Sequence, residues 1–241
     1  APPNFAYAPT NGNVTITNGV AVLTGDIKPE TSITIDAGYR YQGKALTFSA
    51  TAFNVDFKDR QANAFDPATL KTIYTNAGKA RTRGLELEAG TTPVNGWSLY
   101  GSLTLQQSKV LNDLRTSATV VLQTNGKMFA LTPRTLAGLA LQYSQGPLYA
   151  RLKAKHTGNQ FATLMNDEEV PSYMTADFDA GYKFADMAFM KNPMLRLNVS
   201  NIGNTKYRNP SSGTVLSSNG TNVFYYLGAP RFFSVTLSAD F

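Results

Sequence analysis

Residues 233–241 read FSVTLSADF, and the pattern of this stretch decides the fold. Its odd positions, from Phe233 to Phe241, hold apolar side chains, and its even positions hold small polar or acidic ones. Because successive side chains of a β-strand point to opposite faces, the stretch predicts a strand with one apolar and one polar face. One such strand fits any half-buried sheet, so the assignment depends on whether the pattern recurs.

The same alternation recurs throughout the chain. It is present in residues 33–41, 82–89, 97–106, 137–143, 148–155, 174–184 and 195–199. Residues 44–57 fit less cleanly, because their apolar positions shift register between Ala50 and Phe53. This shift predicts a β-bulge, or a strand that extends beyond the lipid. Together with 233–241, these segments predict about nine strands.

Connections of two lengths separate the predicted strands. The short ones are 42–43, 90–96, 144–147 and 185–193, and the long ones are 58–70, 107–133, 157–171 and 204–222. Short and long connections alternate strictly, as expected for a transmembrane barrel with short periplasmic turns and long extracellular loops. Aromatic residues beside the short connections predict an interfacial girdle. They are Tyr39, Tyr41, Trp97, Tyr143, Tyr182, Phe184 and Phe241.

Composition supports a membrane protein built from strands. Hydrophobic residues make up 42% of the chain and charged residues 16%, whereas soluble domains carry about 25% charged residues. No apolar run approaches the roughly 18 residues of a transmembrane helix. A chain that crosses lipid without helices must form a closed barrel. The net charge of +6 is not concentrated in any one run, so no nucleic-acid partner is expected.

Nine antiparallel strands do not close an ordinary bacterial barrel, which has an even number of strands. One solution is that Val14–Leu23 adds a tenth strand and pairs with Ser234–Phe241. The chain would then be a small autonomous barrel with a structural or adhesive role. The other solution is that the chain is part of a larger barrel. Residues 1–30 would then be an extracellular loop or a partial strand, and residues 31–241 the C-terminal part of the barrel.

Several short motifs, in their order and spacing, resemble the C-terminal portion of TonB-dependent outer-membrane receptors. They are Lys28–Ser32 before Asp36–Tyr41, Ala52–Gln61, Asn76–Gly78 before Thr82–Ala89, Thr132–Arg134, Val170–Tyr173 before Asp177, Leu197–Tyr207, and Gly228–Arg231 before the terminal Phe241. The resemblance implies an all-β, antiparallel transmembrane barrel, of which this chain holds about the last nine of 22 strands. It also implies an N-terminal plug, which has no counterpart among these residues.

The resemblance further implies a function and partners. The function is energised uptake of a scarce nutrient across the bacterial outer membrane, with a ferric siderophore favoured and an oligosaccharide or cobalamin as alternatives. The expected partners are the TonB complex, acting through the absent N-terminal region, outer-membrane lipid and lipopolysaccharide, the nutrient itself, and the barrel-assembly machinery. The last strand, ending at Phe241, would be the signal that this machinery reads.

Two groups of residues are candidate ligand-binding sites. Arg151, Lys153 and Lys155 occupy alternate positions of one strand, so all three are predicted to point into the lumen and attract an anionic ligand. Pairing with acidic groups of a plug or of neighbouring strands would explain them equally well. Tyr207 and Tyr225 flank the last long connection, where they could stack on a sugar or an aromatic siderophore, or form an upper girdle.

The sequence does not support an enzyme. The single histidine, His156, has no nucleophile motif around it, and the chain has no cysteine. Glu86 with Glu88, and Asp177 with Asp179, are spaced two residues apart, so each pair shares the polar face of its strand. Pairing with cations of the lumen or plug is favoured over catalysis for both pairs. We therefore expect no catalytic residue, no bound metal and no cofactor.

Overall fold

The computed structural model describes residues 14–17, 20–23, 28–66, 71–115, 121–210 and 223–240. All secondary structure within these ranges is β-strand. No helix in the described part of the chain is long and apolar enough to cross a membrane.

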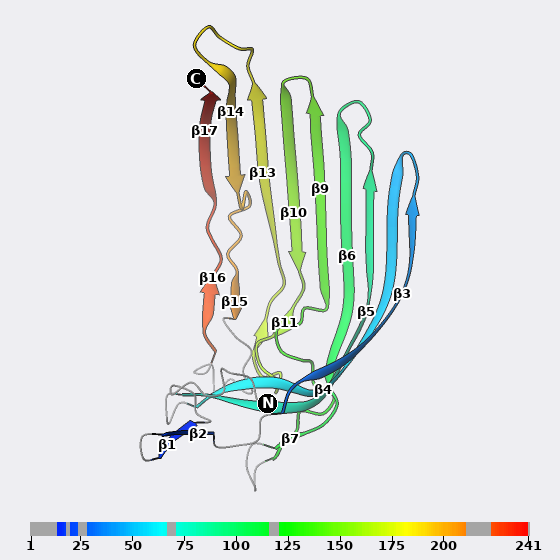
Figure 1. Ribbon diagram of the computed structural model, residues 1–241, viewed down its shortest axis with the longest axis vertical. Coiled ribbons are helices and arrows are strands. Elements are labelled where there is room, and N and C mark those ends of the chain that lie inside the picture. Colours follow the sequence, from blue (N-terminus) through cyan, green and yellow to red (C-terminus); the bar gives the residue numbers. More distant parts are fainter. Residues whose placement is uncertain are drawn as a thin grey trace.

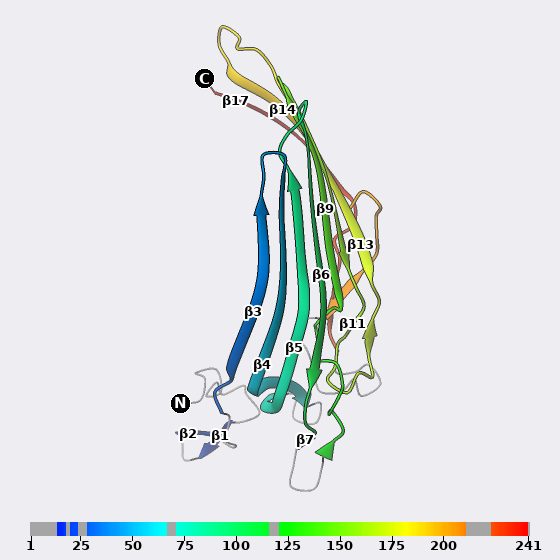
Figure 2. The ribbon, with the colours of Figure 1, turned by 90° about the vertical axis from the view of Figure 1, so that its right-hand side faces the viewer.

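Nine long strands form one antiparallel sheet, in the order β17-β14-β13-β10-β9-β6-β5-β4-β3. The strands are β3 (Thr31–Gln42), β4 (Leu46–Asp66), β5 (Lys71–Thr91), β6 (Trp97–Val110), β9 (Thr135–Gln145), β10 (Leu148–Thr157), β13 (Tyr173–Lys183), β14 (Lys191–Ser200) and β17 (Phe232–Asp240). Each pairs with the long strands that precede and follow it in the chain. Each of the nine segments with alternating side chains corresponds to a strand of this sheet, which is curved and twisted rather than flat (Figures 1 and 2).

The short and long connections lie at opposite ends of the sheet. In Figure 1 the short turns are at the upper end and the long connections at the lower end, as the alternation of lengths predicted. The long connections carry short strands of their own. These are β7 (Leu114–Arg115), β8 (Val121–Leu122), β11 (Gln160–Phe161), β12 (Glu169–Val170), β15 (Arg208–Pro210) and β16 (Tyr225–Leu227).

Two details of the predicted strands were wrong. Residues 58–70 are not mainly a loop, because β4 continues to Asp66 and β5 begins at Lys71. No β-bulge lies between Ala50 and Phe53, because the pairing of β4 with β5 is unbroken there and its register shifts lie between Phe57 and Gln61. The other explanation, a strand that extends beyond the lipid, is compatible with the continuation of β4 to Asp66. Phe53 therefore lies on the polar face, where its ring covers Gly84. An apolar side chain is favourable there because the glycine opposite leaves room for it.

The structure contradicts the alternative in which Val14–Leu23 is a tenth strand that pairs with Ser234–Phe241 to close a small barrel. Val14–Thr17 (β1) pairs with Val20–Leu23 (β2) in a separate two-stranded sheet. The Asn-Gly dipeptide in the middle of this segment is a strong sequence signal for pairing of its two halves with each other. Within the described residues, β3 and β17 are the edge strands of the nine-stranded sheet.

The apolar face of the sheet is open to the surroundings. Ile33 is 69% exposed, Val235 70% and Leu237 71%. On this face Trp97 packs against Tyr143, and Tyr182 against Phe184, each pair with ring centroids 4.9 Å apart. An uncovered apolar sheet bordered by aromatics suits a face that contacts lipid.

The buried apolar residues lie among the long connections instead. One cluster consists of Ala77, Val110, Leu114, Ala130 and Leu164, with Leu122 and Phe129 packed against it. A second consists of Ala162, Val170 and Val223, with Tyr225 packed against it. The long connections therefore fold against one another and form a structured cap at one end of the sheet.

An arginine joins this cap to the sheet. The Arg60 guanidinium lies over the rings of Phe57 and Phe129, 4.1 and 4.9 Å from their centroids. It also forms an ion pair with Glu30 at 2.6 Å, and Glu30 accepts a hydrogen bond from the backbone N–H of Gln61. This network lies where the register of β4 against β5 shifts. It gives Glu30, which belongs to the motif Lys28–Ser32, a structural role.

Candidate functional site

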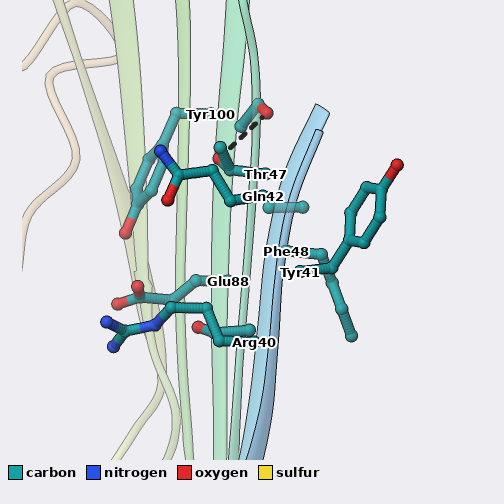
Figure 3. Close-up of a pocket in the computed structure, with 10 residues that line it drawn as sticks. Arg40, Tyr41, Gln42, Thr47, Phe48, Glu88 and Tyr100 are labelled. Atoms are coloured by element: carbon teal, nitrogen blue, oxygen red, sulfur yellow. Dashed lines mark hydrogen bonds between the residues drawn. The ribbon is translucent and has the colours of Figure 1, made fainter. Parts of the chain in front are cut away.

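The polar face of the sheet is continuous across its strands. In Figure 3, Arg40, Glu88 and Tyr100 project to one side of the sheet, and Tyr41 and Phe48 project to the other. The strand register extends this face along one row. The row runs from Ser49 through Glu88, Ser102, Gly138 and Lys155 to Thr175. Lys155 and Glu88 therefore share one face, as their sequence positions predicted.

Arg151, Lys153 and Lys155 all lie on this polar face of β10. Arg151 is opposite Asp179 of β13, and Lys153 is opposite Asp177. Both carboxylates already have other partners: Asp179 accepts a hydrogen bond from Arg196 Nε at 2.8 Å, and Asp177 accepts one from the backbone N–H of Asn201 at 2.8 Å. Among the described residues no ion pair joins the three cations to these carboxylates, although Asp177 and Asp179 line the same depression as Arg151 and Lys153.

Lys153 and Lys155 border a shallow depression with a volume of about 470 Å³. Its floor is low because Gly138 and Ala140 of β9 carry little or no side chain. No carboxylate in the described ranges lies within ion-pairing distance of either lysine. The two ammonium groups are therefore available to an anion that approaches the polar face.

A second depression, of about 320 Å³, lies at the end of the sheet that carries the long connections. It is lined by Val170, Pro171, Ser172, Tyr173, Lys206, Tyr207, Arg208 and Leu227. The rings of Tyr173 and Tyr207 are stacked, with centroids 4.3 Å apart and planes 12° apart. The hydroxyl of Tyr173 donates a hydrogen bond to Asn209 Oδ1 at 3.1 Å. The depression thus combines a fixed aromatic pair with two cationic side chains.

Tyr225 lies beside this depression and holds one of its cations. The Arg208 guanidinium stacks on the Tyr225 ring at 4.3 Å and lies 3.4 Å from Glu168. The Tyr225 hydroxyl donates a hydrogen bond to the same carboxylate. Of the two tyrosines predicted from sequence, Tyr207 lines the depression and Tyr225 supports Arg208. Sequence reasoning missed Tyr173 and Arg208, although both lie in or beside motifs that it had noted.

Partial burial, together with the hydrogen bond to Glu168, raises the pKa of Tyr225 to about 12. An unperturbed tyrosine ionises near pH 10. Because the neutral phenol is the favoured form, the stabilisation is present below pH 10 and is lost as the pH rises from about 10 to about 12. We expect ultraviolet difference titration of wild type against Tyr225→Phe to reveal a tyrosine ionising above pH 11. A Tyr225 midpoint near pH 10 would contradict this, and Glu168→Gln should lower the midpoint.

The remaining candidates from the sequence occupy varied positions. His156 is opposite Met174, on the apolar face of β10, and takes no part in either depression. Glu86 and Glu88 share the polar face, where Glu88 and Arg40 line a third, smaller depression (Figure 3).

Among the described residues, no group of three His, Cys, Asp or Glu side chains could hold a metal ion. Phe241 lies outside the described residues, so its role as an assembly signal stays a prediction.

The fold and the polar face define a class of protein, and comparison with known families identifies it. The family model "TonB dependent receptor-like, beta-barrel" matches residues 2–202. The chain therefore belongs to this family, and its sheet is part of a TonB-dependent receptor barrel. In such a barrel the polar face lines the lumen and the apolar face contacts lipid.

Individual relatives include a ferrioxamine receptor and a catecholate siderophore receptor. The chain is 29% identical over 219 residues to the ferrioxamine receptor of Yersinia enterocolitica, covering 89% of this chain and 28% of that protein. It is 26% identical over 246 residues to the catecholate siderophore receptor Fiu of Escherichia coli K12, covering 99% and 29%. The chain thus spans less than a third of the length of these relatives.

Solved structures agree on the fold. The ferric yersiniabactin uptake receptor FyuA of Yersinia pestis superposes with a TM-score of 0.67 at 24% identity, over 93% of this chain and 32% of that one. The ferric citrate transporter FecA superposes with a TM-score of 0.65 at 23% identity, over 85% of this chain and 30% of that one.

Proposed function

We propose that this chain forms the C-terminal part of the barrel of a receptor that takes up a ferric siderophore across the outer membrane of a Gram-negative bacterium. Residues 31–241 would form barrel wall and residues 1–30 an extracellular loop or partial strand. Family membership and the relatives' names support this proposal. Because the relatives are more than three times longer, we assign the plug and the TonB-contacting segment to the remainder of a longer protein.

The depression at the long-connection end carries the proposal. Stacked aromatic faces favour planar ligand groups, and Lys206 favours negative charge, whereas Glu168 already balances the charge of Arg208. A ferric chelate with anionic aromatic groups offers both features. An oligosaccharide could stack on Tyr173 and Tyr207 but, when neutral, would gain little from Lys206 and Arg208. The position also fits, because in such a barrel the long connections face the outside.

The lysines of β10 suit a later stage of the same process. Lys153 and Lys155 lie on the lumen-facing side, farther along the sheet than the aromatic depression. We propose that they attract the chelate as it passes, or a plug carboxylate when the receptor is at rest. In the proposed setting the apolar face contacts outer-membrane lipid and lipopolysaccharide, the TonB complex supplies energy, and the barrel-assembly machinery recognises β17 together with Phe241.

Replacing Tyr207 by alanine in the full-length receptor should weaken siderophore binding by about two- to tenfold. Loss of aromatic stacking costs roughly 0.5–1.5 kcal/mol, and 1.4 kcal/mol corresponds to about a factor of ten in affinity. The measurement is binding and uptake of radioactive iron, supplied as ferric siderophores, by a receptor-deletion strain that carries the gene. Uptake should also disappear in a strain that lacks TonB.

Tyr226→Ala is the matched control, because Tyr226 is an exposed aromatic of the same connection that does not line the depression. It should leave affinity nearly unchanged. Equal loss for the two variants would argue against this depression as the binding site. Transport of cobalamin or an oligosaccharide, without transport of any iron chelate, would overturn the proposed substrate class.

A further inference from the structure

A carboxylate accompanies the two cations of the depression that contains the stacked tyrosines. Glu168, between β11 and β12, lies 3.4 Å from Arg208 and accepts a hydrogen bond from the Tyr225 hydroxyl. The side chain of Glu168 is 23% exposed and that of Arg208 46%. The carboxylate is therefore the more buried partner of this ion pair.

The position of Glu168 is fixed by its own backbone as well as by its side chain. Its carbonyl oxygen accepts a hydrogen bond from the N–H of Ala162 at 2.9 Å, and Ala162 is fully buried. Moving the carboxylate away from Arg208 would break the hydrogen bond to Tyr225, whose ring also carries the guanidinium. Glu168 therefore stays beside Arg208 when a ligand approaches.

The charges around the depression leave one cation without an acidic partner. No carboxylate in the described part of the chain lies within ion-pairing distance of Lys206. Residues 211–222 of the same connection contain no charged residue. Asp167 accepts a hydrogen bond from the hydroxyl of Thr163 and does not line the depression. The two cations together with Glu168 therefore carry one net positive charge.

This balance bears on the charge of the ligand. Electrostatic attraction grows with the product of the two charges, so a ligand with one anionic group can pair with Lys206. A trianionic ligand would also need the charge of Arg208, which Glu168 already balances, and the carboxylate repels it. Because Glu168 is partly buried, salt screens its charge less than that of an exposed group. The carboxylate therefore disfavours ligands with several negative charges.

The aromatic pair is held in place independently of this ion pair. The Tyr207 ring lies against Gly228, where a Cβ atom would overlap it, and it stacks on Tyr173. Tyr173 in turn donates a hydrogen bond to Asn209. A change in the charge of Glu168 therefore need not move the rings.

We propose that Glu168 is a charge-selecting residue of this depression. It limits the positive charge offered to the ligand and so favours chelates of low negative charge over trianionic ones. This role rests on the proposed function and specifies the charge class of its substrate. Glu168 acts through Arg208 and does not itself line the depression.

Binding of two synthetic ferric chelates to the full-length receptor tests this role. The chelates share one tripodal scaffold with three planar aromatic arms, which are catecholates in the trianionic complex and hydroxypyridinones in the neutral one. Glu168→Gln keeps the shape of the side chain and an oxygen that can accept from Tyr225. We expect a gain of roughly three- to tenfold in affinity for the trianionic chelate, and less than about a twofold change for the neutral one. High salt should reduce the gain.

Glu169→Gln is the matched control, because it removes the same charge from the next residue. The exposed Glu169 carboxylate accepts a hydrogen bond from Asn159 at 2.7 Å and does not line the depression. Both affinities should stay within about twofold of wild type. Glu168→Asp, which shortens the side chain but keeps its charge, should retain the wild-type preference.

An unchanged preference in Glu168→Gln would overturn the proposal, as would an equal loss of affinity for both chelates. So would the same shift of preference in Glu168→Asp, since side-chain length and not charge would then be responsible. A wild-type receptor that binds ferric chelates while Glu168→Gln shows no shift refutes the role of Glu168 alone. A wild-type receptor that binds no ferric chelate refutes the proposed function, and this role with it.

Discussion

Substituting Gly84 by alanine should reduce the amount of assembled receptor in the membrane by roughly tenfold. A Cβ atom at this position would overlap the backbone carbonyl oxygen of Leu105 and would lie 2.7 Å from the Phe53 ring. The ring could rotate, but the carbonyl belongs to the neighbouring strand and cannot move without breaking its pairing. Overpacking of this kind costs about 1–3 kcal/mol. Heat-modifiable migration on gels measures the folded fraction.

Gly101 of β6 provides the matched control. A Cβ atom there would meet its nearest neighbours at 3.9 Å, so Gly101→Ala should assemble normally. The double variant Gly84→Ala with Phe53→Ala identifies the obstacle. We expect no rescue, because the Leu105 carbonyl remains. Restored assembly in the double variant would mean that the aromatic ring, and not the strand backbone, sets the limit.

Gly84 also illustrates what the sequence could predict. The alternation in β5 correctly gave its polar and apolar faces, because lipid on one side imposes a strict two-residue period. That Phe53 breaks the apolar pattern was noticed, but its partner could not be inferred. Gly84 lies 31 residues away in the chain. Only the register between β4 and β5 brings the ring over the glycine, and register depends on the whole hairpin.

The cap formed by the long connections was not predictable in this way. Its buried residues come from separate parts of the chain and share no period: Val110 ends β6, Leu114 lies in β7 and Leu164 lies between β11 and β12. Side chains that form hydrogen bonds with distant backbone groups hold these residues together. Asn166, for example, donates a hydrogen bond to the Met128 carbonyl and accepts one from the Met128 N–H. The sequence analysis identified the long connections, but it could not identify these hydrogen-bond partners.

The candidate site was predicted in part for the same reason. The alternation of side chains along a strand was enough to place Arg151, Lys153 and Lys155 on one face. Whether Asp177 and Asp179 neutralise them depends on competition from Asn201 and Arg196, which lie on the next strand or just beyond it. The stacking of Tyr173 on Tyr207 likewise joins the first residue of β13 to a residue of the β14–β17 connection. Sequence patterns identify which face a residue occupies, whereas partners across strands require the assembled sheet.

Replacing Asn201 by alanine should destabilise the β14–β17 connection by roughly 3 kcal/mol. Asn201 is 5% exposed, and its side chain makes three hydrogen bonds. Its Oδ1 accepts from the Thr205 N–H at 2.9 Å, and its Nδ2 donates to the carbonyls of Thr205 and Ala229 at 3.0 and 2.9 Å. The bond to Ala229 ties the start of the connection to its end. Asn201 also has a φ of 48°, which alanine adopts only at a further cost.

Limited trypsin digestion of the reconstituted receptor measures this loosening, because the connection carries Lys206 and Arg208 as cleavage sites. Cleavage there should be at least about tenfold faster in Asn201→Ala, since 1.4 kcal/mol of local opening already corresponds to a factor of ten. Siderophore binding should weaken in parallel, because Tyr207 loses its fixed position against Tyr173.

Asn204→Ala separates the buried hydrogen bonds from backbone strain. Asn204 has nearly the same φ, 47°, but it is exposed, and its Oδ1 accepts a hydrogen bond from the Arg231 N–H at 3.1 Å. If strain alone matters, the two alanine variants will be digested at equal rates, and the role assigned to the Asn201 side chain is wrong. If the three buried bonds matter, Asn201→Ala will be cleaved much faster. Asn201→Gly, which tolerates the backbone conformation but lacks the side chain, will then resemble Asn201→Ala.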